Sequence, residues 1–242
     1  RQADTLLENK LSLLGSPLQD IGNPVDWVYY PDGDPQWQSH LGYMGYLESL
    51  IDASRYTGDR KYADKWVSFV LEFIENHPWG TNQLSYSKRM PMYANEYTPV
   101  CGGEGFCPDY IGGSWIALAC ASRSRQWMKD LPFLLRHDWI SAIEVCKVVQ
   151  SIMTDHFFVM LNNPRKGTPN QYLHVANTLL ELGIIFWEFK IAPAGYLIGM
   201  QRLEEAIDKC VLPDGTDLEQ SPNYNTFLPS GFYDIYSIPE MK

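Results

Sequence analysis

Hydrophobic positions recur at helical spacing along most of the chain. The clearest pattern covers residues 37–51, where large apolar residues follow one another at steps of three and four. It is followed by Thr57-Gly58-Asp59, in which Gly58 can end one helix and Asp59 can cap the next. The next segment repeats the spacing and stops before Pro78. We therefore predict two helices joined by a tight antiparallel turn.

Further apolar patterns predict more helices. Residues 139–160 carry their apolar side chains on one face, which predicts one long amphipathic helix. That face consists of Trp139, Ile143, Cys146, Val149, Met153, Phe157 and Met160. Residues 174–189 are apolar on most faces, so we expect a helix buried on both sides. Another helix opens at Pro193, a residue favoured in a first turn. Shorter helices are expected near 3–14 and 111–128.

Strand patterns are scarce, so the sequence predicts an all-α fold. Successive antiparallel helical hairpins, some buried and some half-exposed, fit an incomplete (α/α) toroid that occupies residues 1–242 as a single domain. A solenoid of helical repeats is the rival, but the chain shows no internal sequence period. Residues 15–36 and 78–110 are long and rich in Gly, Pro, Asn and aromatics, which is typical of functional loops.

Composition narrows the classes of function. The chain has 242 residues, 45% of them apolar and 14% aromatic, which excludes a disordered protein. Apolar runs such as residues 157–161 are about a quarter of the ~20 residues that a membrane-spanning helix needs. The chain has 19 Lys and Arg residues and 29 Asp and Glu residues, so its formal net charge is −10. This negative charge argues against nucleic-acid binding. A local basic pocket could still bind an acidic substrate.

The five cysteines are too few and too widely spread for a disulfide scaffold. Cys120, Cys146 and Cys210 lie in helical patterns and are expected to be small buried hydrophobes. Cys101 and Cys107 flank a short glycine-rich stretch and could bridge it. No spacing typical of metal ligands occurs, so no metal site is expected.

Three stretches carry candidate chemistry. The first is the aromatic and acidic segment 23–37, which includes Trp27, Tyr29, Tyr30 and Trp37. The second is Ser85-Tyr86-Ser87-Lys88-Arg89. The third pairs residues 167–171 with 212–224, which contain Asp214-Gly215, Glu219 and Tyr224. The four aromatic residues either line a sugar-binding cleft or belong to the core.

In this order, the stretches resemble the N-terminal α/α-toroid domain of the heparinase II/III-like polysaccharide lyases. The features that match are Asp26-Trp27, Gln36-Trp37, the Thr57-Gly58-Asp59 hairpin, an arginine in the following loop, and an asparagine that opens a late helix. The distance from Asn170 to Tyr224 is 224 − 170 = 54 residues, close to the spacing in that family. The resemblance covers about residues 20–225.

The resemblance implies β-elimination at a uronic acid of an acidic polysaccharide, in the periplasm or outside the cell. It assigns Asn170 to neutralising the substrate carboxylate and Tyr224 to acid, and in some members base, catalysis. It assigns Arg89 to binding an anionic sugar group. Gln171 would lie beside the substrate, where several lyases have a histidine, and Glu219 would orient its neighbours. Neither proton transfer requires a metal, and no cofactor is expected.

The resemblance also implies a longer protein. Members of the family carry a C-terminal β-sandwich domain that supplies a histidine to the cleft, so the chain is expected to be a fragment. Two other functions remain open. An inverting glycoside hydrolase could use a carboxylate pair from among Asp109, Asp214, Asp217 and Glu219. A glycan-binding protein without catalysis could keep the aromatic residues alone.

Overall fold

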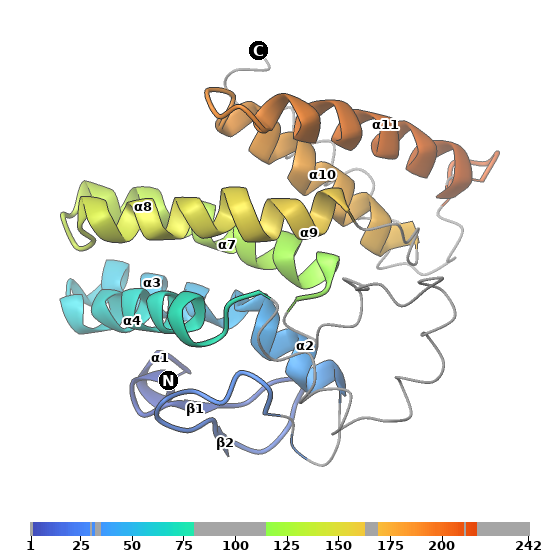
Figure 1. Ribbon diagram of the computed structural model, residues 1–242. Coiled ribbons are helices and arrows are strands. Elements are labelled where there is room, and N and C mark those ends of the chain that lie inside the picture. Colours follow the sequence, from blue (N-terminus) through green and yellow to red (C-terminus); the bar gives the residue numbers. More distant parts are fainter. Residues whose placement is uncertain are drawn as a thin grey trace. The chain divides into compact units, whose positions relative to one another are not determined.

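The structure is a computed structural model that describes residues 2–29, 31, 35–79, 115–162, 169–210 and 212–216. At positions 35, 169, 170, 209 and 210 it describes the backbone only. The described residues are mostly helical, which confirms the predicted predominance of helix (Figure 1). Contacts divide the chain into two compact units, residues 1–156 and 157–242, and each is described by itself.

The first unit contains most of the helices and one short hairpin. Its elements are α1 (Gln2–Leu7), β1 (Lys10–Leu11), β2 (Gln19–Asp20), α2 (Pro35–Tyr43), the 3-10 helix η2 (Gly45–Leu47), α3 (Glu48–Thr57), α4 (Arg60–Asn76), α7 (Ala117–Arg136), α8 (Ala142–Ser151) and the π-helix η5 (Ile152–His156). The second unit contains α9 (Phe157–Leu161), α10 (Pro169–Ile185) and α11 (Ala192–Cys210).

The predicted turn between α3 and α4 is confirmed. Gly58 follows α3 with φ 71°, a left-handed conformation that glycine adopts without strain. Asp59 is the N-cap of α4, and its carboxylate accepts a hydrogen bond from the Lys61 amide at 3.0 Å. The two helices lie side by side in Figure 1. Local signals at three residues therefore determine this hairpin.

The predicted helix over residues 37–51 is interrupted. Met44 has φ 58°, so the backbone turns out of the helix after α2 and resumes through η2 into α3. The apolar residues of the pattern are nevertheless all buried, namely Trp37, Leu41, Met44, Leu47 and Ile51. The spacing therefore predicted burial correctly, whereas the continuity of the helix was wrong.

The helix predicted over residues 139–160 is also interrupted, by the π-helix η5. Its apolar face is only partly covered: Met153 and Phe157 are buried, whereas Ile143 is 73% exposed and Cys146 is exposed. The prediction that Cys146 is buried was wrong. Ser141 caps α8 in a reciprocal capping box, but no neighbouring element covers the side of the helix that carries Ile143 among the described residues.

Two other predicted helices end earlier than expected. The helix near 3–14 ends at Leu7, because Asn9 adopts φ 54° and the chain enters the β1–β2 hairpin. The apolar segment 174–189 is helical only to Ile185, and Trp187 beyond it is 68% exposed. By contrast, α11 begins at Ala192, next to the predicted Pro193, and α7 confirms and extends the helix near 111–128.

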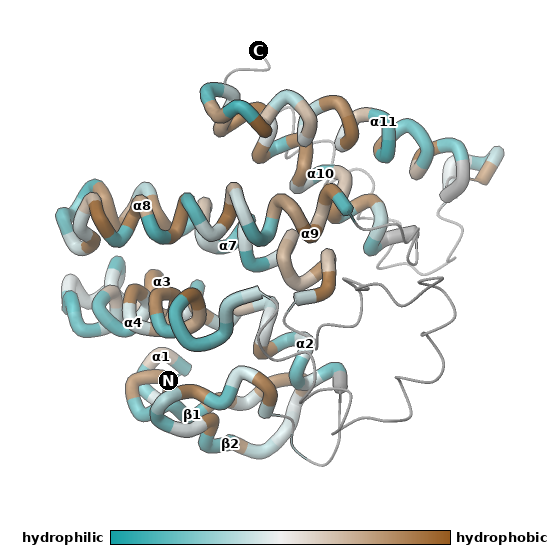
Figure 2. The backbone as a smooth tube through the Cα atoms, viewed as in Figure 1, coloured by the Kyte–Doolittle hydropathy of each residue, from teal (hydrophilic) through white to brown (hydrophobic). Residues whose placement is uncertain are grey.

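Aromatic rings form much of the interior of the first unit. Trp27 packs edge-on against Phe69 and Phe73 of α4, with ring centroids 6.0 and 5.1 Å away. Such edge-to-face pairs add to the stability gained by burying the rings. Along α4, hydrophobic and hydrophilic residues alternate in Figure 2, as expected of a helix with one face in the core.

The second unit is organised around the α10–α11 pair. Leu173, Ala176 and Leu180 of α10 pack with Leu203 and Ala206 of α11. The helices approach so closely that a Cβ added to Gly183 would lie 2.6 Å from the Tyr196 backbone nitrogen. Glycine is therefore needed at this crossing for steric reasons.

Candidate functional site

The first turn of α10 carries two of the predicted site residues. The helix begins at Pro169, so Asn170 and Gln171 lie at its amino end, as the sequence predicted. The side chain of Asn170 lies outside the described residues, and that of Gln171 is exposed. The amino end of a helix carries a partial positive charge, which favours binding of an anionic group.

The helix α10 is held in place by the other helices of the second unit. It packs against α11, and the guanidinium of Arg202 on α11 donates to the Met160 carbonyl at 2.6 Å and to the Leu161 carbonyl at 2.8 Å. These are the last residues of α9, so Arg202 satisfies carbonyls that the helix end leaves without intrahelical partners. The result is a three-helix support for the turn that bears Asn170.

Asp214 lies in a tight turn. Its carboxylate accepts hydrogen bonds from the Thr216 hydroxyl at 2.7 Å and from the Thr216 amide at 3.0 Å, and Gly215 has φ 84°. These bonds hold the pKa of Asp214 below its ordinary value. A general acid needs a raised pKa, so Asp214 is suited to shaping this turn and poorly suited to protonating a leaving group.

The remaining predicted site residues lie outside the described residues. They are Arg89, Glu219 and Tyr224, together with Asp109 and Asp217 of the hydrolase alternative. Lys88, Cys101, Cys107 and Tyr30 also lie outside them. The described structure therefore places Asn170, Gln171 and Asp214 in their local elements and brings no two of the assigned catalytic groups together.

The two tryptophans of segment 23–37 belong to the core, whereas Tyr29 is half-buried. Trp27 is 3% exposed and Trp37 is 1% exposed. Trp37 donates from Nε1 to the Ser16 hydroxyl at 2.9 Å and packs edge-on against Tyr29. Core packing, one of the two interpretations of the sequence, is therefore correct for these tryptophans.

A buried arginine is the most unusual polar group of the first unit. Arg123 of α7 is fully buried, and its guanidinium donates to the Gly42 carbonyl at 2.6 Å and to His156 Nε2 at 2.7 Å. Since His156 Nε2 accepts this bond, its Nδ1 carries the proton and donates to the Ser151 carbonyl at 2.9 Å. Burial and the neighbouring Arg123 charge lower the pKa of His156 well below its ordinary value.

Aromatic rings surround the same guanidinium. Its central carbon lies 4.3 Å from the Phe73 ring centroid, 4.9 Å from that of Trp115 and 5.8 Å from that of Trp127. Cation–π attraction is strongest where water is excluded, as it is here. Gly42 precedes the last residue of α2, so the guanidinium also lies at the negative end of that helix. Both effects offset the cost of burying the charge.

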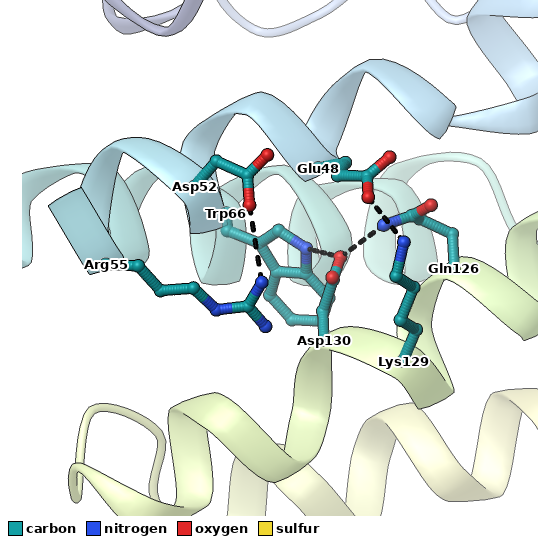
Figure 3. A network of polar contacts seen from close by, with 7 residues as sticks. All are labelled: Glu48, Asp52, Arg55, Trp66, Gln126, Lys129 and Asp130. Carbon is teal, nitrogen blue, oxygen red and sulfur yellow. Dashed lines mark hydrogen bonds and ion pairs between the residues drawn. The ribbon is translucent and has the colours of Figure 1, made fainter.

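A second buried ionisable group lies on α7. Asp130 accepts hydrogen bonds from Trp66 Nε1 at 2.8 Å and from Gln126 Nε2 at 2.9 Å. Figure 3 shows it beside two exposed ion pairs, Lys129 with Glu48 and Arg55 with Asp52. Burial raises the pKa of Asp130 to about 6, although both donors favour its ionised form. Its carboxylate joins α7 to α4.

Arg123 and Asp130 are not among the candidate residues that the sequence pattern indicated. Both lie on a helix that was predicted only to residue 128. Charged residues of a helix normally face solvent, so the burial of these two was not expected. The available signal was spacing: Cys120, Arg123 and Trp127 recur at steps of three and four and so share one face. His156, between Met153 and Phe157, lies on a buried stripe in the same way.

Several features are absent from the described ranges. No three His, Cys, Asp or Glu side chains there are grouped as a metal site would require. Within the same ranges, no helix is both long and apolar enough to span a membrane. Cys120 is buried, and burial raises the pKa of its thiol to about 12, which makes it unreactive at neutral pH.

The family comparison covers nearly the whole chain. The model of the heparinase II/III N-terminus family matches residues 3–242. The chain is 24% identical over 228 residues to the heparin-sulfate lyase of Bacteroides thetaiotaomicron, covering 92% of this chain and 28% of that protein. It is 22% identical over 219 residues to the heparin-sulfate lyase of Pedobacter heparinus, covering 90% of this chain and 29% of that protein. The chain thus spans less than a third of these curated relatives.

Solved structures show the same fold. A mutant of the heparan sulfate lyase HepC from Pedobacter heparinus superposes with a TM-score of 0.74 at 20% identity, covering 97% of this chain and 33% of that chain. A crystal structure of heparinase III superposes with a TM-score of 0.75 at 20% identity, covering 99% of this chain and 34% of that chain. Similarity at this identity establishes a common fold and leaves the activity to be argued.

Proposed function

Because this chain belongs to the heparinase II/III family through its N-terminal domain, we propose that it forms the toroid part of a polysaccharide lyase. The protein would cleave a uronic-acid-containing glycan, of the heparan sulfate or alginate kind, by β-elimination. The family match over residues 3–242 carries this proposal, since it includes every residue to which the resemblance assigns a role.

The proposed architecture is an incomplete (α/α) toroid that works with a C-terminal β-sandwich domain of the same protein. The described hairpins α3–α4 and α10–α11 are the kind of unit from which such a toroid is built. The length of the relatives supports the further domain, because each is more than three times as long as the matched region. We place the protein in the periplasm or outside the cell, where polymeric glycans are accessible.

The proposed reaction begins with removal of the proton on C5 of the uronate. An ionised carboxylate beside C5 makes this proton weakly acidic, so the charge that develops on the carboxylate must be stabilised. Asn170 is suited to this task, because its amide donates hydrogen bonds without acting as a competing base. Its position at the amino end of α10 adds the favourable field of the helix.

The other assigned residues complete the reaction. Tyr224 protonates the leaving glycosidic oxygen as the bond from C4 breaks, and the C5 proton passes to a base. A tyrosine has an ordinary pKa near 10, so it would itself act as that base only beside cationic groups. Arg89 binds an anionic group of the sugar through its two-pronged guanidinium. Gln171 contacts the substrate next to Asn170, and Glu219 orients neighbouring groups.

The test is to express the complete gene product and measure release of unsaturated uronides from heparan sulfate and alginate by ultraviolet absorbance. Tyr224→Phe should lower kcat by at least about a hundredfold, the contribution typical of general acid–base catalysis. Tyr56→Phe is the matched control, because Tyr56 is 94% exposed on α3 and should leave turnover unchanged.

The outcome also separates the alternatives. Full activity of Tyr224→Phe would remove Tyr224 from the mechanism. Saturated products would indicate the inverting hydrolase, although Asp214 is already engaged in its turn and three carboxylates would remain as candidates. Binding of several acidic glycans without turnover would indicate a glycan-binding protein. We expect the 242-residue chain alone to be nearly inactive, and robust turnover by it would contradict the need for a further domain.

A further inference from the structure

Residues 185–197, which join α10 to α11, carry an exposed apolar surface in the second unit. Trp187 is 68% exposed and Leu197 is 65% exposed. No other stretch of this length among the described residues has as many exposed large apolar side chains. A cluster of this kind is typical of a surface that another polypeptide covers. The surface, here called the turn patch, consists of Ile185, Trp187, Phe189, Ile191, Tyr196 and Leu197.

The backbone of the turn holds these side chains in place. The Phe189 amide donates to the Phe186 carbonyl at 2.8 Å, and the Ala192 amide donates to the Phe189 carbonyl at 3.0 Å. The Phe186 and Phe189 rings pack edge-on, with centroids 5.6 Å apart. Gly183 of α10 lies against the backbone of Tyr196 in α11, which anchors both sides of the turn. The turn patch would therefore lose little conformational entropy when a partner binds it.

The charges of the turn limit the kind of partner. Glu188 and Lys190 are the charged residues of the stretch 185–197, so its formal charge is zero. A surface that bound an acidic glycan or an anionic membrane would need an excess of cationic groups. Apolar residues with balanced charge are instead typical of the centre of a permanent interface between polypeptides.

The lengths of the relatives indicate which polypeptide can cover the turn patch. The chain covers 28% of the heparin-sulfate lyase of Bacteroides thetaiotaomicron and 29% of that of Pedobacter heparinus. A complete protein of similar length would hold most of its residues outside this chain. Those residues are covalently linked to the turn patch, so their effective concentration is far higher than that of a second copy or a separate protein.

We propose that the turn patch is the surface on which the rest of the same protein, outside residues 1–242, packs through an apolar face. This inference rests on the proposed function, which requires a further part of the same protein. It identifies Trp187 and Leu197 as side chains that are exposed in this chain and buried in the complete protein.

The experiment measures how fast hydroxyl radicals oxidise individual side chains in the complete gene product, with its oligomeric state followed by light scattering. After correction for the intrinsic reactivity of each side chain, Trp187 should react as slowly as Trp127, which is 0% exposed. Tyr56, which is 94% exposed on α3, is the reference for rapid oxidation.

Two outcomes of this measurement would overturn the inference. The first is rapid oxidation of Trp187 in the monomer, because the turn patch would then be open to solvent. The second is slow oxidation in a dimer that becomes rapid on dilution to the monomer, because the occupant would then be a second copy of the chain.

A charged substitution provides an independent measurement in the complete gene product. Leu197→Asp should lower Tm by about 5 °C or more, because it places an unpaired charge in a buried interface. Ile143→Asp is the matched control, since Ile143 is also an aliphatic residue near the start of a helix and is 73% exposed. Its Tm should change by less than about 2 °C. Equal shifts for the two variants would contradict a special role of the turn patch.

Activity assays separate this inference from the proposed function. A protected Trp187 in a protein that releases no unsaturated uronides would support the inference and contradict the lyase. An exposed Trp187 in a protein that does release them would overturn the inference and leave the lyase intact.

Discussion

In the first unit the interior is arranged around charged and aromatic side chains, whereas the α10–α11 pair of the second unit brings two helix backbones into contact. Arg123 and Asp130 each satisfy partners on other helices through directional hydrogen bonds. Between α10 and α11 the fully buried contacts are aliphatic, with Tyr172 donating to Glu205 at the edge, and glycines at positions 183 and 199 make the close approach possible.

This difference predicts which kind of mutation each interior tolerates. An interior held by hydrogen bonds depends on keeping each donor, acceptor and charge, so its stability should respond to pH and to loss of a partner. An interior in which helix backbones pack closely depends on the volume of its side chains, so its stability should fall when atoms are added. The first arrangement joins helices through specific polar contacts, and the second suits a rigid support for the turn that carries Asn170.

The largest effect should come from adding one methyl group between α10 and α11. In Gly183→Ala the new Cβ would lie 2.6 Å from the Tyr196 nitrogen and 2.9 Å from the Ala192 oxygen, so the helix backbones must separate. We expect a loss of about 3 kcal/mol in the free energy of unfolding, measured by urea denaturation. Gly45→Ala is the control, because nothing lies within 4 Å of its added Cβ. Equal stability of the two variants would refute close backbone packing as the basis of this pair.

A smaller effect should appear in the pH dependence of the first unit. The pKa of Asp130 is raised from 3.8 to about 6 by burial, so the folded state binds more protons than the unfolded state between these values. Stability contributed by the protonated carboxyl is therefore complete below about pH 4 and is lost as pH rises to about 6, by on the order of 2 kcal/mol.

Asp130→Asn should remove this part of the pH dependence, because the amide oxygen can still accept from Trp66 and Gln126 but does not ionise. Unfolding free energies measured from pH 4 to pH 7.5 in the wild type and the variant give the difference directly. Asp64→Asn serves as control, since Asp64 is an exposed partner of Arg60. Parallel pH profiles for wild type and Asp130→Asn would show that Asp130 ionises normally.

The smallest effect should show that not every buried polar atom of the first unit contributes to stability. The Ser124 hydroxyl is fully buried on α7, and within the described structure it has no hydrogen-bond partner. Ser124→Ala should therefore be neutral or stabilising by up to about 1 kcal/mol in thermal unfolding. In the second unit Thr178→Val removes a bonded hydroxyl, which donates to the His174 carbonyl at 2.9 Å, and should cost more. A clear loss of stability in Ser124→Ala would reveal a partner for that hydroxyl.

Much of the helical framework could be predicted because its signals are local. Gly58 and Asp59 identify a helix end and a helix start within two residues, and Pro193 predicted the start of α11 to within one residue. The candidate site was predicted through the order of short motifs, of which the structure describes Asn170 and Gln171 at the start of α10. The roles of these residues, and of Arg89, Glu219 and Tyr224, remain proposals.

The sequence by itself determined where most of the helices lie, which positions recur on one helix face, and which family the motif order resembles, because all three depend on spacing along the chain. Only the tertiary structure decided which of those helix faces are buried against another element. Ile143 shares the spacing of Met153 and stays exposed, whereas Arg123 carries a charge and is buried. The physical reason is that burial depends on elements distant in sequence: the Gly42 carbonyl, the Phe73 ring and His156, which all contact Arg123, come from α2, α4 and η5.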